Sequence, residues 1–498
     1  MSMKALAGQT AIYGISSIAA RMLNYLLTPY LTRIFSEEGY GVVTFMYALI
    51  PLALVVLTMG LETGYFRFAG AARAREERRA LFASAWGAVS LLAGLLVVVV
   101  TCFSTSIAGM LGYAEHPSFI WLVGLIIGLD VVMAIPFCRL RAEGRAGRFV
   151  VLKVVSVVIN VALCFFFYSG LPGLAARGEF LAWAWNPAFA QGYVFVANAV
   201  ASAVTLLLLL PGAGTWPRLS WRVLKPVLLY SLPLLVSGIA GTANEFIDRL
   251  MIEWLLPVEI ARASVGVYGA VVKIGVILLL FTQMYRYSAE PYFLSGIKRE
   301  DFTRLNAVAM KYFIIVSIAI FLGITLFADL FALIIGRDFR EGMYILPVVL
   351  VSNILSGIVF NLSFWYKQMN RTRFAIMITG TGLVFTLVFN VLLVPRLGYF
   401  GAALARLACE VAMVVVSYRL NRVHCPTPYE LRRVGEYALV GALLFGAGLL
   451  TASAPAAIRY PCNALMWIAF CLHAARREKI DVMSMITSIT SIIKQMKR

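Results

Sequence analysis

The sequence predicts an all-α polytopic membrane protein with about 14 transmembrane helices. Hydrophobic residues make up 61% of the 498 residues, charged residues make up only 13%, and the mean hydropathy is +0.87. A soluble globular chain is roughly 45–50% apolar and about 25% charged. This composition argues against a soluble enzyme, a disordered chain and a disulfide-stapled secreted module.

Fourteen apolar stretches are long enough to cross a bilayer, which takes about 20 residues in a helix. They lie at about 10–34, 41–65, 81–103, 118–138, 150–170, 190–211, 226–251, 264–285, 312–335, 342–366, 374–395, 400–420, 435–453 and 456–474. Proline and glycine interrupt several of them, which membrane helices tolerate better than soluble ones do.

The connections between these stretches alternate between basic and nearly uncharged. Of the 43 Lys and Arg residues, thirty-two lie on one set of connections, seven on the other and four inside predicted spans. Cytoplasmic loops carry an excess of Lys and Arg, so both termini are expected in the cytoplasm. The net charge of +19 is therefore explained by topology and does not indicate nucleic-acid binding.

Two short patterns recur six spans apart. They are Arg145-Ala-Gly-Arg148-Phe149 with Asn370-Arg-Thr-Arg373-Phe374, and Gly39-Tyr-Gly41 with Val267-Tyr-Gly269. Transporters are often built from two related bundles. We therefore expect an N-terminal six-helix lobe over residues 1–215, a second over 216–422, and a terminal helix pair with a basic tail over 423–498.

The first span carries a polar face. Ser17, Arg21, Asn24 and Thr28 are spaced so that all four lie on one side of a helix. Hydrogen bonding between helices would explain the uncharged members. An arginine inside a span is costly and favours a cavity, so Ser17, Arg21 and Asn24 are candidate substrate-binding residues.

The seventh span contains Asn244, Glu245, Asp248, Arg249 and Glu253. Two ion pairs one helical turn apart are possible, from Arg249 to Glu245 and to Glu253, and these would neutralise the cluster. The alternative is a functional site, with Asn244 and Arg249 binding substrate.

Two further spans carry cations. Lys273 has no carboxylate within one turn, so we expect it to face water or substrate. Arg406 and Glu410 are one turn apart in the twelfth span, which predicts a structural ion pair.

Three acidic residues are candidates for ion coupling: Glu62, Asp130 and Asp248. A carboxylate inside a membrane can titrate near neutral pH, as proton coupling requires. A salt bridge from Arg21 to Glu62 or Asp130 is the structural alternative.

The sequence contains no P-loop, no metalloprotease or serine-hydrolase motif, and no Cys or His spacing typical of a metal site. We expect no cofactor and no bound metal. Transport would then be driven by an ion gradient, the membrane potential or the substrate gradient.

Four segments resemble Wzx-type polysaccharide flippases, which belong to the multidrug, oligosaccharidyl-lipid and polysaccharide exporter superfamily. They are Gly8-Gln-Thr-Ala-Ile-Tyr-Gly-Ile-Ser-Ser17, Tyr30-Leu-Thr-Arg-Ile-Phe-Ser36, Gly60-Leu-Glu-Thr-Gly-Tyr-Phe-Arg67 and Val394-Pro-Arg-Leu-Gly398 with the Tyr-Phe-Gly401 that follows. The resemblance extends over the whole chain in the number and order of spans.

This resemblance implies two six-helix lobes around a cavity that opens alternately to each side of a bacterial cytoplasmic membrane. It also implies a substrate, an undecaprenyl-pyrophosphate-linked oligosaccharide used for surface polysaccharide, whose phosphates would contact Arg21, Arg249 and Lys273. The implied partners are this glycan, membrane lipid, a polysaccharide polymerase and a chain-length regulator, with no nucleic acid.

Alternatives remain at this point. A lipid II flippase and a cation-coupled multidrug exporter belong to the same superfamily. A membrane polysaccharide polymerase or acyltransferase belongs to another class, but the short and sparsely charged outer loops argue against such an enzyme.

Overall fold

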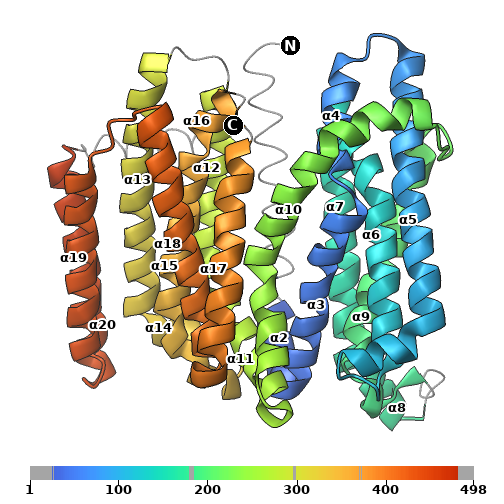
Figure 1. Ribbon diagram of the computed structural model, residues 1–498. Helices are drawn as coiled ribbons and strands as arrows, with labels where there is room; N and C mark the ends of the chain where they lie inside the picture. Colours follow the sequence, from blue (N-terminus) through green and yellow to red (C-terminus); the bar gives the residue numbers. More distant parts are fainter. Residues whose placement is uncertain are drawn as a thin grey trace, which may run out of the picture.

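The computed structural model describes residue 25 and residues 27–178, 184–294, 299–369, 371 and 373–479. Within these ranges the regular structure is helical throughout, and the long helices run side by side (Figure 1). The expected all-α membrane fold is therefore confirmed.

The N-terminal half contains eight α-helices and three short helical turns. They are α2 (Leu27–Ile34), α3 (Glu37–Leu57), α4 (Leu61–Ala71), α5 (Arg75–Met110), α6 (Pro117–Ala142), α7 (Ala146–Phe165), η1 (Phe166–Gly170), α8 (Leu171–Ala176), η3 (Pro187–Phe189), α9 (Gly192–Leu209) and η4 (Leu210–Gly212).

The C-terminal half begins with a long helix that crosses the molecule. Its elements are α10 (Trp221–Leu255), α11 (Val258–Ile274), α12 (Val276–Leu294), α13 (Arg299–Leu326), α14 (Ala328–Ala332), η5 (Asp338–Ile345), α15 (Leu346–Leu362), α16 (Phe364–Gln368), α17 (Arg373–Leu397), α18 (Tyr399–His424), α19 (Leu431–Leu450) and α20 (Ala456–Arg477).

Local chemistry explains several helix boundaries. Ser36 caps α3 by accepting a hydrogen bond from the backbone N–H of Gly39 at 3.2 Å, and Glu37 and Glu38 follow in the first turn, where negative charge is favourable. Gly60, with φ of +65°, separates α3 from α4, and Gly398, with φ of +59°, separates α17 from α18. Only glycine adopts this left-handed region without steric cost.

Eleven helices in the described ranges are long and apolar enough to cross a membrane, or up to twelve if α11 and the bent α12 count as one span. The expected number of 14 is thus not confirmed. Most of the first predicted span lies outside the described residues, and α20 is not among the eleven because its charged and polar residues lower its hydropathy.

The helices form two groups. On one side α5 packs against α6, and α9 packs against both α6 and α7; on the other, α18 packs against α17 and α15, and α13 packs against α15. Figure 1 shows the first group on the right and the second on the left, with α19 and α20 at the far left edge. The exact lobe boundaries at 215 and 422 stay predictions.

The two groups meet where α3 crosses α11. A methyl group on Gly41 would collide with the backbone carbonyl of Arg262, and one on Gly266 would collide with the carbonyl of Glu37. Only glycine therefore permits this approach of the two backbones. The contact, which we call the seam, brings together the two Tyr-Gly repeats, and both Tyr40 and Tyr268 are fully buried.

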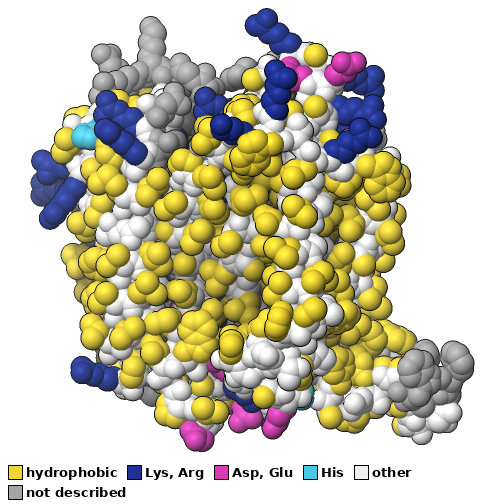
Figure 2. All heavy atoms as spheres, turned by 45° about the vertical axis from the view of Figure 1, so that its right-hand side comes forward, with side chains coloured by type: hydrophobic (Ala, Val, Ile, Leu, Met, Phe, Trp, Pro, Cys, Tyr) yellow, Lys and Arg dark blue, Asp and Glu magenta, His cyan; other side chains and the backbone are white. Residues whose placement is uncertain are grey.

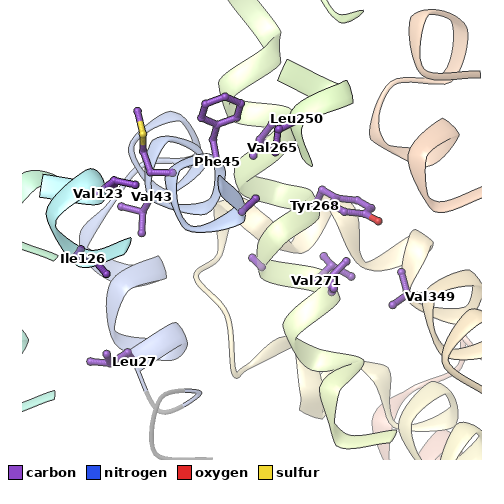
Figure 3. Packing of buried hydrophobic residues seen from close by; sticks show 14 of the residues in the cluster. Leu27, Val43, Phe45, Val123, Ile126, Leu250, Val265, Tyr268, Val271 and Val349 are labelled. Atoms are coloured by element: carbon purple, nitrogen blue, oxygen red, sulfur yellow. The ribbon is translucent and has the colours of Figure 1, made fainter. Parts of the chain in front are cut away.

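Apolar packing extends from both sides of the seam. Figure 3 shows Val43 on α3 beside Val123 of α6, while Phe45 lies toward Leu250 of α10 and Val265 of α11. One continuous hydrophobic core therefore joins the two helix groups.

Polar contacts also join the groups at the end of the molecule where α3 and α11 begin. Gly336 donates its backbone N–H to Thr32 Oγ1 at 3.0 Å, and Arg33 donates to the carbonyl of Leu333 at 2.6 Å. In Figure 1 the ribbons of the two groups converge at this lower end and stand further apart at the upper end.

Charge is distributed unevenly between the two ends. Figure 2 shows an apolar band around the middle of the molecule, most Lys and Arg side chains above it, and a group of Asp and Glu side chains below it. We call the upper end the basic end. It carries the connections that the sequence analysis identified as rich in Lys and Arg.

The helix α10 belongs to both groups. Its first half packs against α4, where Gly60 and Gly64 lie directly on the backbone and side chain of Ser231. Its second half packs against α17 and α18. A rearrangement between the groups must therefore involve this helix.

The terminal helices α19 and α20 are fixed to α13 by buried ions. Lys311 Nζ lies 2.7 Å from Glu478 and 2.9 Å from Glu430, and Tyr437 donates to Glu478 at 2.7 Å. The Lys311 and Glu478 side chains are only 7% and 4% exposed. Burial opposes ionisation of Glu478, but hydrogen bonds from Lys311 and Tyr437 outweigh it and hold the pKa of this carboxyl below its ordinary value.

Replacing Glu478 with Ala should destabilise the attachment of the terminal pair. Lys311 would lose its buried partner and keep only the more exposed Glu430, so we expect the free energy of unfolding to fall by about 2 kcal/mol at neutral pH, less than for a buried charge left with no partner. Because the native pKa is lowered, this contribution is present above about pH 4.3 and disappears as the pH falls through the native pKa. Unfolding of the purified protein in detergent, followed at several pH values, measures both effects.

The matched control is the more exposed pair of Arg477 on α20 and Glu436 on α19, whose side chains are 3.2 Å apart. Exposed pairs contribute about 0–1 kcal/mol, so Arg477→Ala should have little effect. Equal losses from both variants would contradict a special role for the buried pair.

Candidate functional site

Half of the predicted substrate-binding residues cannot be placed. Ser17, Arg21 and Asn24 lie outside the residues that the structure describes. Their role, and the salt bridge proposed from Arg21 to Glu62 or Asp130, stay predictions. The other candidates fall in three places: a charged cluster on α10, the seam, and the N-terminal helix group.

Asp248 is the centre of the charged cluster. Its side chain is 2% exposed, and Oδ1 accepts hydrogen bonds from Arg249 through the backbone N–H at 2.9 Å and through Nη1 at 2.6 Å. Its Oδ2 accepts from the hydroxyl of Tyr268 and lies 4.0 Å from Nη1 of Arg406. A buried carboxylate needs such compensation, and three helices supply it here.

The two ion pairs predicted within the seventh span do not form. Arg249 forms an ion pair with Asp248 and donates a hydrogen bond to the backbone carbonyl of Glu245 at 2.5 Å. It forms no ion pair with the Glu245 carboxylate. Glu253 instead accepts from Tyr113 at 2.9 Å and lies 3.7 Å from Arg262. Tertiary neighbours thus provide partners that spacing along one helix cannot reveal.

The predicted pair of Arg406 and Glu410 is also replaced by a different arrangement. Arg406 is buried and directs its guanidinium toward Asp248 and toward Asn353, which accepts from Nη2 at 3.3 Å. Glu410 is buried as well, and its Oε2 has no hydrogen-bond partner. The two charges are one turn apart without forming an ion pair within 4 Å.

Asn244 connects α10 to α17. Its amide donates to the backbone carbonyl of Thr379 at 3.2 Å, and its carbonyl accepts from Thr386 at 3.2 Å. Both the nitrogen and the oxygen of the Asn244 amide therefore have hydrogen-bond partners on α17. Packing between the two helices is enough to explain why Asn244 is buried.

Lys273 lies at the seam. It is half-buried in the last turn of α11, and its ammonium is 5.7 Å from the ring centre of Tyr40 on α3. Within the described residues it forms no ion pair, unlike Arg249 and Arg406. A cation in this position can attract an anionic group that enters between the helix groups.

Glu62 and Asp130 lie apart from the cluster, in the N-terminal helix group. Asp130 accepts a hydrogen bond from Ser202 at 2.9 Å. Glu62 lies beside Cys138, with the charges of Arg141 and Lys153 near enough to act on it. Neither carboxylate forms a salt bridge within 4 Å in the described part of the chain.

Sequence reasoning did not foresee Tyr268 and Asn353 as members of the cluster. Tyr268 had a signal, because its Tyr-Gly pattern repeats that of Tyr40, but the repeat does not predict contact with Asp248. Asn353 lies in an ordinary apolar stretch, and no pattern in the sequence indicates that it contacts charged residues. In the described ranges, no group of three or more His, Cys, Asp or Glu side chains could hold a metal ion.

Solved structures of membrane transporters share this arrangement of helices. The lipid II flippase MurJ in an inward closed conformation superposes with a TM-score of 0.70, covering 94% of this chain and 99% of that one, at 13% identity. The multidrug transporter DinF-BH superposes with a TM-score of 0.61, covering 85% and 96%, at 18% identity. At these identities the likeness shows the fold.

Two proteins are related in sequence. Putative protein 1 of the Lsg locus in Haemophilus influenzae is 21% identical over 371 residues, covering 72% of this chain and 84% of that protein. The probable low-salt glycan biosynthesis flippase Agl15 of Haloferax volcanii is 23% identical over 316 residues, covering 62% of each chain.

A family model described as polysaccharide biosynthesis protein matches residues 6–296, which is more than half of the chain. The match includes α10, the seam and both acidic residues of the N-terminal group. The chain therefore belongs to the polysaccharide biosynthesis protein family, in agreement with the resemblance of its motifs to Wzx-type polysaccharide flippases.

Proposed function

We propose that this protein is a transporter that flips a lipid-linked glycan across a membrane. The single observation that carries the proposal is Lys273, a cation inside a membrane-spanning segment, at the seam of two helix groups, with no ion pair in the described residues. Charge in this environment is costly unless it serves a partner or a substrate. The Haloferax relative, described as a probable glycan flippase, supports the same class of activity.

The finer proposal is that the substrate is an undecaprenyl-pyrophosphate-linked oligosaccharide. Pyrophosphate oxygens form strong charge-assisted hydrogen bonds with Lys and Arg in partly dry surroundings. Lys273, Arg249 and Arg21 would provide these contacts. The product would be a surface polysaccharide.

The proposed orientation places the basic end in the cytoplasm of a bacterium and both termini on that side. Polar contacts and the glycine seam join the helix groups at the opposite end. Under this proposal the arrangement is one stage of alternating access, in which the substrate would enter from the inner leaflet. Glu62, Asp130 and Asp248 remain the candidates for coupling an ion to the cycle.

Lipid analysis of a deletion strain tests the function directly. Loss of the flippase should cause undecaprenyl-pyrophosphate oligosaccharide to accumulate on the inner leaflet, because its synthesis continues while its export stops. Extraction of the lipids and mass spectrometry identify both the carrier and the sugar repeat. Accumulated lipid II would instead identify a lipid II flippase, and an unchanged pool with lower drug resistance would identify a drug exporter.

Replacing Lys273 with Ala should reduce glycan export by about 10- to 100-fold, because a hydrogen bond to a charged group contributes about 1.5–3 kcal/mol. Lys273→Arg should restore most of the export, since it keeps the charge. Surface glycan is measured in cells, together with the amount of protein in the membrane fraction.

The matched control is Lys225→Ala, which removes an exposed cation near the start of α10. Its export should stay near the wild-type level. Normal export by Lys273→Ala would eliminate the proposed contact with phosphate.

Neutralising the acids of the N-terminal group tests ion coupling. If Asp130 or Glu62 carries the coupled proton, Asp130→Asn or Glu62→Gln should flatten the dependence of transport on pH, because the titrating group is gone. Transport by the purified protein in liposomes is measured between pH 5.5 and 8.5, an interval that brackets about pH 7. Asp329→Asn, in an exposed ion pair with Arg459, is the control, and an unaltered profile in both test variants would assign these acids a structural role.

A further inference from the structure

We propose that the Asp248 cluster transmits occupation of Arg249 by an anionic headgroup to the bend between α11 and α12. The inference rests on the proposed function, because it requires a negatively charged substrate at Arg249. It assigns Asp248, Arg406 and Asn353 a positioning role that involves no contact with the substrate.

The first link is the contact between Arg249 and Asp248. The Arg249 side chain is 11% exposed, so part of it is accessible, whereas Asp248 is almost completely buried. Phosphate oxygens would compete with the carboxylate for the same guanidinium. Both are anionic acceptors, and two phosphates provide more oxygens than one carboxylate does.

The second link is the response of Asp248 to losing this partner. A carboxylate buried among α10, α11 and α18 cannot remain without a cation at low energetic cost. The nearest replacement is Arg406, whose Nη1 already lies 4.0 Å from Oδ2. Movement of this guanidinium by about 1 Å would convert the loose contact into a direct ion pair.

The third link joins Arg406 to the bend. Its Nη2 donates to Asn353 Oδ1 at a rather long 3.3 Å, and Asn353 Nδ2 in turn donates to the backbone carbonyl of Gly275 at 3.0 Å. Gly275 separates α11 from α12, which are inclined to each other by 47°. The amide of Asn353 therefore connects the charged cluster directly to the point where the chain changes direction.

Arg406 is not locked in its present orientation. Its Nε is buried without a hydrogen-bond partner, and the same is true of Glu410 Oε2 one turn away. Two carboxylates, Asp248 and Glu410, thus lie near one guanidinium that contacts the first only loosely. Such an arrangement has two alternative sets of contacts, as a switch between two states requires.

Gly275 makes the bend sensitive to small movements. A methyl group at this position would lie 2.9 Å from Val349 and 3.2 Å from the Asn353 amide, so the backbone already touches α15. When Arg406 moves toward Asp248, Asn353 loses the contact that orients it. Its hydrogen bond to Gly275 weakens, and α12 can change its inclination to α11.

The experiment measures the bend in the full chain, reconstituted in nanodiscs. Spin labels replace Ile260 on α11 and Met284 on α12, and pulsed electron spin resonance records the distance between them with undecaprenyl pyrophosphate or with uncharged undecaprenol. In the wild type, undecaprenyl pyrophosphate should shift the distance distribution and undecaprenol should not.

Two variants break the transmission at different links. Asn353→Ala should bind undecaprenyl pyrophosphate with wild-type affinity but show no shift, because the connection to Gly275 is missing. Asp248→Asn should bind about fivefold more tightly, because Arg249 no longer has a competing carboxylate, and should also show no shift. The control is Asn390→Ala, another fully buried asparagine, whose amide donates only to its own helix at Thr386, and it should keep the shift.

The outcomes separate this inference from the proposed function. A shift that persists in Asn353→Ala, or a wild type that binds without any shift, would overturn the transmission and leave the flippase proposal intact. Equal binding of undecaprenyl pyrophosphate and undecaprenol by the wild type would overturn the pyrophosphate substrate, and with it the trigger assigned to Arg249.

Discussion

The cost of placing charge among apolar helices governs the interior of this protein. Asp248 is compensated from three directions, by Arg249 on its own helix, Tyr268 on α11 and Arg406 on α18. Because each partner comes from a different helix, the charges fix how α10, α11 and α18 pack. The same requirement operates at the basic end, where Lys311 and Glu478 attach the terminal pair.

The seam depends on the opposite property, the absence of side chains. Gly41 and Gly266 allow two backbones to touch, and a larger residue at either position would separate α3 from α11. Van der Waals contact between small residues is a typical way to associate helices in a membrane, where burial of apolar surface gives no advantage. The glycine contact itself has no directional bond, so the backbones of α3 and α11 can separate at this point without breaking an ion pair between them in the described residues.

Much of the fold follows from the sequence, because a span is a local property. The stretches predicted at 118–138 and 400–420 correspond closely to α6 and α18, since each needs only about 20 apolar residues. The number of spans is harder to predict than the position of each one. The sequence of α20 resembles a span but contains polar residues, and α11 and α12 are interrupted at Gly275, which no hydropathy pattern distinguishes from a straight helix.

The site was less predictable, because its contacts are between helices. A spacing of four residues puts Arg249 one helical turn from Glu245 and Arg406 one turn from Glu410. It cannot show that both arginines direct their guanidinium groups toward Asp248 instead of forming these ion pairs. Lys273 is the instructive exception. The prediction that it lacks a carboxylate partner relied on an absence along one helix, and in the described residues tertiary packing brings it the Tyr40 ring but no carboxylate.

The two helix groups differ in how the charged side chains inside them are compensated. Among the described residues, Glu62 and Asp130 of the N-terminal group form no salt bridge, whereas the second group contains a cluster in which most charges are compensated. If ions act on the first group and substrate acts on the second, the two effects can meet only where the groups touch. In the described residues that region comprises the seam, the hydrogen bonds of Thr32 and Arg33, and α10, which packs against α4 at one end and carries Asp248 and Arg249 at the other. A movement of α10 would therefore change the surroundings of both sets of charges at the same time. This helix is the structural element best placed to link ion binding to substrate transfer.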